Sequence, residues 1–141
     1  MGPFPHDSAP AEISAHNPMG TDGFEFVEYA HPNPAELHGL FRSMGFAPVA
    51  KHRTKAITLY RQGDINYVVN EEPGSHGANF VAKHGPCAPS MAFRVVDAKH
   101  AFDRALSLGA EAADPKDGSK TLDVPAIKGI GGSLLYFVET Y

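Results

Sequence analysis

The sequence predicts an α+β fold in which two tandem βαβββ modules form one strongly curved, open-barrel-like mixed sheet with helices on its outside. The first observation behind this is a repeat: a strand, a glycine-terminated helix and further strands occur twice along the chain. The second is geometric, because one helix covers only one face of a four-stranded sheet and each module needs the other to shield its inner face. A chain of 141 residues can bury such a core without disulfides.

The first module begins with FEFVEYA at residues 24–30, which is rich in aromatic and β-branched residues and predicts a strand. Asn33 is a suitable N-cap and Pro34 suits the first helical position. The helix that follows has apolar residues at helical spacing and ends at Gly45. Three extended runs then complete the module, with the tight-turn pair Gly63-Asp64 between the last two. These runs cover residues 46–51, 56–61 and 65–70.

The second module repeats this order. A strand is predicted at 90–96, a helix capped by Asp97 at 98–108, a short strand at 120–124 and a closing strand at 134–140. The helix residues recur 64 positions after their counterparts, and Gly109 falls on Gly45. The closing strand aligns at a spacing of 69, which implies an insertion of about five residues between the helix and this strand. This alignment pairs Ile65 with Leu134, Tyr67 with Tyr136 and Val69 with Val138.

Domain boundaries follow from composition. Residues 1–22 contain four prolines among small polar residues, which predicts a flexible N-terminal arm. We expect residues 23–141 to form a single domain, with modules at about 23–73 and 90–141. The polar linker 74–89 between them has room for a short helix at 78–83.

Charge and cysteine usage exclude several classes. The net charge of −4 and pI near 6.0, with scattered basic residues, argue against nucleic-acid and anionic-membrane partners. No run approaches 18 apolar residues, so no membrane span is predicted. Cys87 is the single cysteine, which excludes an internal disulfide and favours a small structural residue over a catalytic thiol. We therefore expect a cytoplasmic protein.

The stretch KGIGGS at 128–133 resembles a phosphate-binding loop, but its order is wrong for one. A phosphate loop follows a strand and opens a helix, whereas here LLYFV follows and predicts a strand. The spacing also fails the dinucleotide and nucleotide-loop patterns. The glycines are therefore predicted to form a turn or bulge into the last strand.

Other catalytic constellations are also weak. The eight histidines show no metal-binding spacing, and those on the predicted helices, His38 and His100, are expected to face outward. Ser90 and Ser133 lack the glycine pattern of a hydrolase elbow. Glu71 and Glu72 are adjacent, so their side chains point apart and do not form an acid–base pair.

The paired βαβββ arrangement resembles the vicinal oxygen chelate fold of the glyoxalase, bleomycin resistance and dioxygenase superfamily. Four segments are similar to the N-terminal half of bacterial 4-hydroxyphenylpyruvate dioxygenases: GFEFVEYAHPNPAELHGLFRSMGF, HRTKAITLYRQGDINYVVNEEP, HGPCAPSMAFRVVDA and LDVPAIKGIGGSLLYFVE. The resemblance runs from about residue 20 to residue 141. It implies an Fe(II)-dependent conversion of 4-hydroxyphenylpyruvate to homogentisate in tyrosine catabolism. It also implies that the iron, held by two histidines and one glutamate, belongs to a C-terminal half that this chain lacks.

Within this fold, metal ligands come from the start of the first strand and the middle of the last strand of a module. Those places fall at Glu25 or Phe26 and at Ser90 for the first strands, and at Tyr67 and Tyr136 for the last. The resemblance therefore implies no catalytic, cofactor-binding or metal-binding residue in this chain. We expect Tyr67 and Tyr136 to be core aromatics that fill the concave face.

Three functions stay open at this point. The first is a non-catalytic N-terminal domain that stabilises a C-terminal catalytic domain of the same protein and builds contacts in a homo-oligomer. The second is a free-standing protein of the same fold that binds a small aromatic ligand in the concave sheet. The third is a dimeric metal-dependent lyase or isomerase with ligands shared across subunits.

Overall fold

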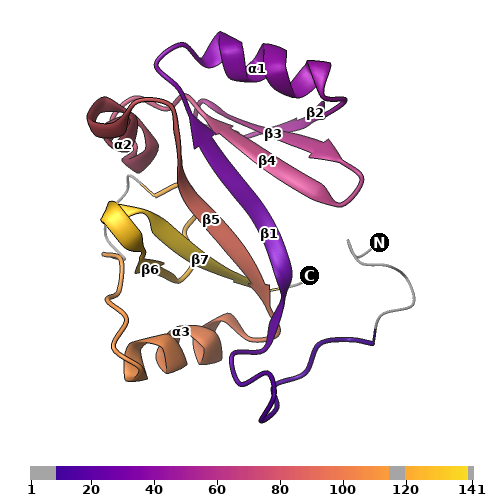
Figure 1. Ribbon diagram of the computed structural model, residues 1–141, viewed down its shortest axis with the longest axis vertical. Helices are drawn as coiled ribbons and strands as arrows, with labels where there is room; N and C mark the ends of the chain where they lie inside the picture. Colours follow the sequence, from indigo (N-terminus) through magenta and orange to yellow (C-terminus); the bar gives the residue numbers. More distant parts are fainter. Residues whose placement is uncertain (1–8, 115–119, 140–141) are drawn as a thin grey trace.

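The computed structural model describes residues 9–114 and 120–139 (Figure 1). In chain order the elements are β1 (Thr21–Ala30), α1 (Pro34–Ser43), β2 (Ala47–Lys51), β3 (Ile57–Gln62), β4 (Ile65–Asn70), α2 (His76–His84), β5 (Cys87–Val95), α3 (Ala98–Ser107), β6 (Ala126–Lys128), the 3-10 turn η1 (Ile130–Gly132) and β7 (Leu134–Glu139). The predicted α+β class is confirmed.

The strands form one mixed, unclosed sheet in the order β2-β3-β4-β1-β5-β7-β6. Each module contains a parallel pair, β1 with β4 and β5 with β7, and the antiparallel pairing of β1 with β5 joins the modules. Helices α1 and α3 lie at opposite ends of the molecule, outside the strands of their own module (Figure 1). The paired-module architecture is thus confirmed, and its concave face is shared by both modules.

Each helix packs on its own cluster of strand residues. In the first module, α1 contributes Phe41 to an aromatic cluster on the outer side of β3 and β4. In the second, small residues of α3 such as Ala101 and Ala105 lie against Val95 and Phe137 of β5 and β7. Burying each large apolar side chain contributes about 1.5–3 kcal/mol relative to leaving it exposed. These two clusters fix the helices outside the sheet and leave the concave face to a third cluster.

The concave cluster holds alternate residues of the central strands. Its fully buried aromatic residue is Tyr136, which packs beside Phe26 with ring centroids 5.9 Å apart. The other buried members are Ile57, Val68, Ala92, Ala113, Ala126, Leu134 and Val138. The expectation that Tyr136 fills the concave face is confirmed.

The expectation for Tyr67 is wrong. Glu28 pairs with Val68 across the first parallel pair, and Ala92 pairs with Tyr136 across the second. Because Glu28 and Ala92 keep the 64-residue spacing of the helices, Tyr136 corresponds to Val68. The alignment of the closing strands is therefore off by one residue, which reverses the face of every side chain. Tyr67 packs against α1 instead, stacked on Phe46 at 4.4 Å between ring centroids.

The structure differs from the prediction at the short strand of the second module and agrees with it at the linker helix. Residues 120–124 are not a strand; the short strand of the second module is β6, and Ala112 adds an isolated bridge to Ile127. The possible helix at 78–83 is confirmed as part of α2. Regular structure also extends into the ends of the predicted arm and linker, since β1 begins at Thr21 and β5 at Cys87.

The glycine stretch at 128–133 turns the chain into the last strand, as predicted. Gly131 and Gly132 have φ values of 65° and 87°, which favour glycine, and β7 begins two residues later. The carbonyl of Gly132 accepts a hydrogen bond from Nε2 of His76 at 2.8 Å, which ties this turn to α2. No helix within the described residues has the length and apolar character to cross a bilayer.

Candidate functional site

A buried carboxylate, Glu28, lies at the centre of the concave face. It is 0% exposed and accepts hydrogen bonds from Nδ2 of Asn70 at 3.2 Å, Oγ of Ser90 at 3.0 Å and Oγ1 of Thr121. These donors belong to β4, β5 and the segment 120–124, so one side chain joins three parts of the chain that are distant in sequence. A Cβ at Gly77 of α2 would lie 3.0 Å from Oε1 of Glu28, so a larger residue would have to displace this carboxylate slightly.

Strand alternation explains why Glu28 points inward. Phe26, Glu28 and Ala30 are buried alternate residues of β1, and their neighbours are less buried. The sequence placed Glu25 or Phe26 at a ligand position of the fold and gave no role to Glu28. The signal was the alternation of Phe26, Glu28 and Ala30, but a charged residue on the buried face became recognisable only once the register was known.

The segment 120–124 closes one side of the concave face. The backbone N–H of Thr121 donates to the hydroxyl of Tyr136 at 3.0 Å, and Nζ of Lys55 donates to the carbonyl of Lys120 at 2.8 Å. Burial, together with the charge of Glu28, raises the pKa of Tyr136 to about 12. The Tyr136 hydroxyl is therefore neutral at physiological pH and fills space that a charged ligand group would need.

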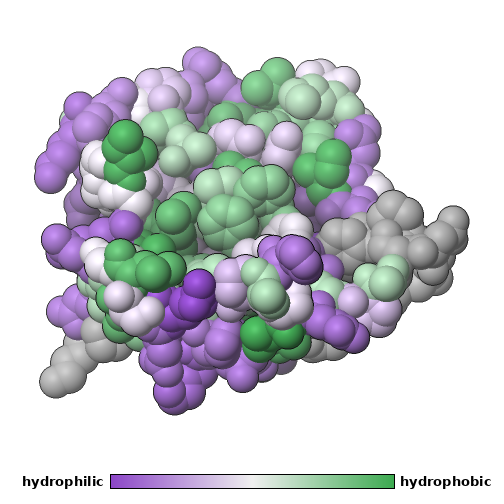
Figure 2. Space-filling view, turned by 60° about the horizontal axis from the view of Figure 1, so that its bottom comes forward, coloured by the Kyte–Doolittle hydropathy of each residue, from purple (hydrophilic) through white to green (hydrophobic). Residues whose placement is uncertain are grey.

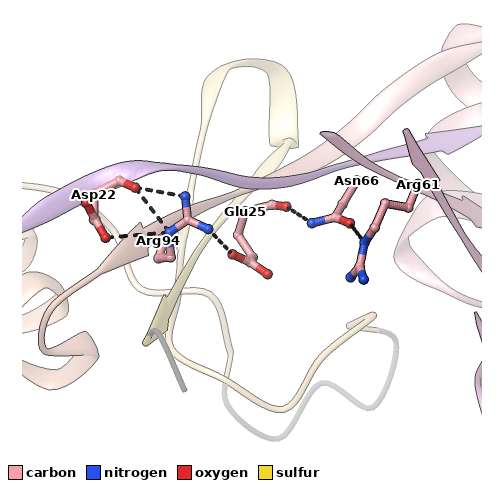
Figure 3. Close-up of polar contacts among 5 residues, drawn as sticks. All are labelled: Asp22, Glu25, Arg61, Asn66 and Arg94. Carbon is pink, nitrogen blue, oxygen red and sulfur yellow. Dashed lines mark hydrogen bonds and ion pairs between the residues drawn. The ribbon is translucent and has the colours of Figure 1, made fainter. Parts of the chain in front are cut away.

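Arg94 pairs with the carboxylate of Glu25, which the sequence had placed at a ligand position of the fold. It is buried on β5 and donates from Nη1 to Oε2 of Glu25 at 3.1 Å. Its Nε and Nη2 donate to the carbonyl of Asp22 at 3.1 and 3.0 Å (Figure 3). Glu25 thus serves as a counter-ion of a buried arginine, together with the Asp22 carboxylate, whose Oδ2 lies 3.7 Å from Nε of Arg94.

A second polar chain continues from the same strand to Arg61. The carbonyl of Glu25 accepts from Nδ2 of Asn66 at 3.0 Å, and Oδ1 of Asn66 accepts from Nε of Arg61 at 2.7 Å (Figure 3). This contact uses the inner nitrogen of the guanidinium and leaves its two terminal nitrogens outside the Asn66 contact. Arg61 is exposed, so a fixed, accessible cation stands beside Glu25.

These residues line an open pocket of about 300 Å³ on the concave face, which we call the concave pocket. Its lining is mainly apolar. The polar lining residues are Lys51, His52 and Arg61, the acidic Glu25, and the neutral Asn66 and Thr121. The apolar lining residues are Phe26, Ala50, Ile57, Leu59, Val68, Leu122 and Val138. Tyr136 and Ala126 do not line this pocket. The first module therefore keeps an open space where the second module is filled.

The residues at the inferred metal-ligand positions make other contacts. Glu25 pairs with Arg94, Phe26 is a core residue, and Ser90 donates to Glu28. Within residues 9–114 and 120–139, no three His, Cys, Asp or Glu side chains are placed to share a metal ion. The partners of Glu28 are hydroxyls and an amide, which do not match the two imidazoles and one carboxylate of a non-haem Fe(II) centre. That this chain binds no iron stays a prediction.

The two helix histidines do not face outward as predicted. His38 forms two hydrogen bonds. Its Nδ1 lies 2.7 Å from the hydroxyl oxygen of Tyr60, and its Nε2 lies 2.9 Å from Oε2 of Glu71. His100 contacts the carbonyl of Pro18 through Nε2 at 2.9 Å. Both are half-buried because each ties a helix to a neighbouring segment, a role that helical spacing alone does not reveal.

Cys87 is not activated as a nucleophile. Burial raises the pKa of its thiol, and the charge of Glu28 raises it further. The thiol is therefore mostly protonated near neutral pH, which agrees with a structural role.

Comparison with known proteins places this geometry in a family. A family model described as "Hydroxyphenylpyruvate dioxygenase, HPPD, N-terminal" matches residues 15–141. The chain belongs to this family. It is 54% identical over 132 residues to the protein named hemolysin VllY of Vibrio vulnificus, covering 92% of this chain and 37% of that protein. It is 50% identical over 125 residues to 4-hydroxyphenylpyruvate dioxygenase of a Pseudomonas species, covering 89% of this chain and 35% of that enzyme.

The chain thus spans a little over a third of the length of these curated relatives. Among solved structures, it is similar to a xylose isomerase-like TIM barrel/4-hydroxyphenylpyruvate dioxygenase fusion protein, with a TM-score of 0.79 and 40% identity. The match covers 94% of this chain and 21% of the fusion protein. This chain corresponds to the N-terminal half of a hydroxyphenylpyruvate dioxygenase, with the vicinal oxygen chelate fold.

Proposed function

We propose that this chain is the non-catalytic N-terminal half of a 4-hydroxyphenylpyruvate dioxygenase, and that it stabilises a C-terminal catalytic half. The observation that carries the proposal is the combination of a family match over residues 15–141 with coverage of about a third of the dioxygenase. The iron of the reaction is then held by the other half. This agrees with the partners of Glu28, which are two hydroxyls and an amide and include no imidazole. The complete protein would convert 4-hydroxyphenylpyruvate to homogentisate in the cytoplasm, a compartment that suits a single unactivated thiol.

An exposed apolar region supports a protein partner. Phe24 and Ile65 are 61% and 52% exposed, and both line an open pocket of about 300 Å³ together with Val27, Tyr67 and Met91. Phe24 also packs on Phe93 with ring centroids 5.3 Å apart. Independently of Phe24 and Ile65, Figure 2 shows apolar residues over the middle of one face of the molecule, with hydrophilic residues around them. Apolar surface of this kind is typical of a contact with another domain or subunit.

The catalytic assignment is tested with the chain by itself and in reconstitution. The purified chain, supplied with Fe(II), ascorbate and 4-hydroxyphenylpyruvate, should show neither oxygen uptake nor homogentisate above a no-protein control. Co-expression with the C-terminal part of the Pseudomonas dioxygenase should give a co-purifying complex with more activity than that part expressed without this chain. Turnover by the isolated chain would contradict the non-catalytic role, and independent behaviour of the two parts would contradict the stabilising one.

The proposed contact and homo-oligomer are tested by size. Phe24→Asp and Ile65→Asp should lower the apparent mass in multi-angle light scattering, or abolish co-purification with the C-terminal part, with unchanged circular dichroism. Ile130→Asp is the matched control, because Ile130 is 93% exposed but lies in the glycine turn of the second module. If all three variants behave alike, Phe24 and Ile65 do not form the contact.

The concave pocket also supports a second candidate function, small-molecule binding, through its open volume and its basic side chains. A metal-dependent lyase or isomerase has no comparable support among the described residues.

A further inference from the structure

We propose that the concave pocket of the first module binds a small molecule that has an apolar body and one carboxylate, and that Arg61 holds this carboxylate. The site lies within the chain itself, so the inference does not depend on a catalytic partner. It deepens the second candidate function by naming the chemical class of the ligand and the residue that holds it, and it is independent of the stabilising role.

The size and lining of the pocket suit an apolar body. Its volume of about 300 Å³ is at the lower end for small-molecule sites, which are mostly apolar with a few convergent polar groups. Ile57, Leu59 and Val68 come from neighbouring strands, and Leu122 approaches from the segment 120–124. Space of this size accepts one aromatic ring or a short alkyl chain, and burying it would supply the apolar part of the affinity.

The charge at the pocket is positive where a ligand head group would lie. Arg61 is oriented by the 2.7 Å contact of its Nε with Asn66, and Asn66 is itself held by the backbone of Glu25 at 3.0 Å. A guanidinium fixed in this way offers its terminal nitrogens to a carboxylate at little further cost in side-chain entropy. Glu25 also lines the pocket, and its Oε2 is bound to Arg94 at 3.1 Å, so that arginine is a cationic partner of this carboxylate.

His52 adds a directed donor to the same pocket. Its Nδ1 accepts from the backbone N–H groups of Thr54 and Lys55 at 3.2 and 3.1 Å. An imidazole that accepts through Nδ1 carries its proton on Nε2, and this N–H can donate to an anion. With the ammonium of Lys51, the pocket thus combines three donors and an apolar floor. This pattern favours an anion over a neutral or cationic ligand.

The experiment compares a carboxylate with its neutral isostere. Isothermal titration calorimetry and ligand-observed NMR are performed on the full chain with 3-phenylpropanoate, hexanoate and 3-phenylpropanamide. The carboxylates should bind saturably with one site per chain, and the amide should bind at least tenfold more weakly, because a charge-assisted hydrogen bond is lost. Binding should weaken as salt concentration rises, since the pocket is open to solvent.

Three variants locate the site. Arg61→Gln should reduce carboxylate affinity about tenfold or more, and Asn66→Ala should reduce it less, because it frees Arg61 without removing the charge. Arg42→Gln is the matched control: Arg42 is also an exposed arginine, but it lies in the last turn of α1, outside the sheet. Since Arg61 is exposed, its substitution should leave the thermal unfolding temperature unchanged, so a loss of binding reports on the ligand contact.

A fourth variant tests the apolar floor. Leu59→Phe should fill part of the concave pocket and weaken binding of both carboxylates, while circular dichroism shows that the fold is retained. The proposal is overturned if no carboxylate binds saturably, if the amide binds as tightly as the acid, or if Arg61→Gln and Arg42→Gln have equal effects. Unweakened binding to Leu59→Phe would place the ligand elsewhere and overturn it as well.

Discussion

Replacing Glu28 should destabilise this domain more than replacing any exposed glutamate. Glu28 is fully buried, and three side-chain donors from β4, β5 and the segment 120–124 converge on its two oxygens. Glu28→Ala removes all three acceptor contacts at once and leaves a cavity between the strands and this segment.

The magnitude follows from these contacts. A buried donor left without a partner costs about 1–3 kcal/mol, and Glu28→Ala leaves three such donors, of which the two hydroxyls can rotate towards other acceptors. We therefore expect Glu28→Ala to lower the free energy of unfolding by about 3–5 kcal/mol. Glu28→Gln keeps the size of the side chain, and the Ser90 and Thr121 hydroxyls can rotate to accept from its amide. Its cost should be smaller, about 1–2 kcal/mol, and should reflect the lost charge.

Urea unfolding followed by far-ultraviolet circular dichroism measures both variants, because the chain has no tryptophan for fluorescence. Glu111→Ala is the control, since the Glu111 side chain is 74% exposed and its pair with Lys128 at 3.0 Å should contribute less than about 1 kcal/mol. The reasoning fails if Glu28→Ala costs no more than Glu111→Ala. If the alanine variant does not fold, a glutamine variant as stable as the wild type would refute it equally.

Three further predictions concern local features. A tyrosine in the unfolded chain has a pKa near 10, whereas Tyr136 in the folded state has a pKa of about 12. The folded state therefore keeps the Tyr136 proton to higher pH, and the stability of the domain falls as pH rises from 10 towards 12. Tyr136→Phe should remove about 1.4 kcal/mol of this alkaline loss at pH 11, measured by urea unfolding at pH 9 and 11, and an unchanged loss would show that Tyr136 is not its source. Gly39→Ala, in the exposed interior of α1 with open space around the new Cβ, should stabilise the domain by about 0.5–1 kcal/mol. Gly109→Ala should destabilise it by about 1 kcal/mol, because Gly109 has a φ of 97°. Equal shifts of the thermal unfolding temperature would contradict both assignments. Asp97→Ala should cost about 1 kcal/mol in thermal unfolding, because its side chain caps α3 through the N–H of His100 at 2.8 Å, and Asp103→Ala, in an exposed pair, should cost clearly less.

The sequence predicted what depends on local chemistry. Helices α1 and α3 begin and end close to their predicted positions, because Pro34, Asp97, Gly45 and Gly109 act through contacts within a few residues. The glycine turn at 128–133 was predicted for the same reason. The paired-module architecture followed from repetition, which needs no knowledge of side-chain contacts.

The register of the closing strands could not be obtained in this way. Tyr67 and Tyr136 are identical residues at plausible equivalent positions, and aligning them gave a spacing one residue too long. Only the strand pairs Glu28–Val68 and Ala92–Tyr136 show the true correspondence. Because alternate residues face opposite sides, this single-residue difference moved Tyr67 from the concave face to the helix side.

Glu28 was missed because its partners are distant in sequence. Asn70, Ser90 and Thr121 lie 42, 62 and 93 residues away, and none of them forms a motif with Glu28 along the chain. An isolated glutamate in a strand is normally solvent-exposed, so its burial follows from the pairing of three segments. A ligand site in the concave sheet was one of the predicted alternatives, but its lining residues could not be named from the sequence, since they combine strands from both modules.

The two modules use the concave face differently, and this difference connects the fold to its proposed roles. In the second module, Tyr136 and the segment 120–124 occupy the space beside Glu28, and their hydrogen bonds hold that side closed. In the first module the corresponding residue is Val68, whose smaller side chain leaves the concave pocket open. One half of the sheet has thus become a core that supports the domain, while the other retains a shaped surface with an oriented arginine. An open, mainly apolar pocket beside an arginine that Asn66 orients is the physical argument for a ligand there.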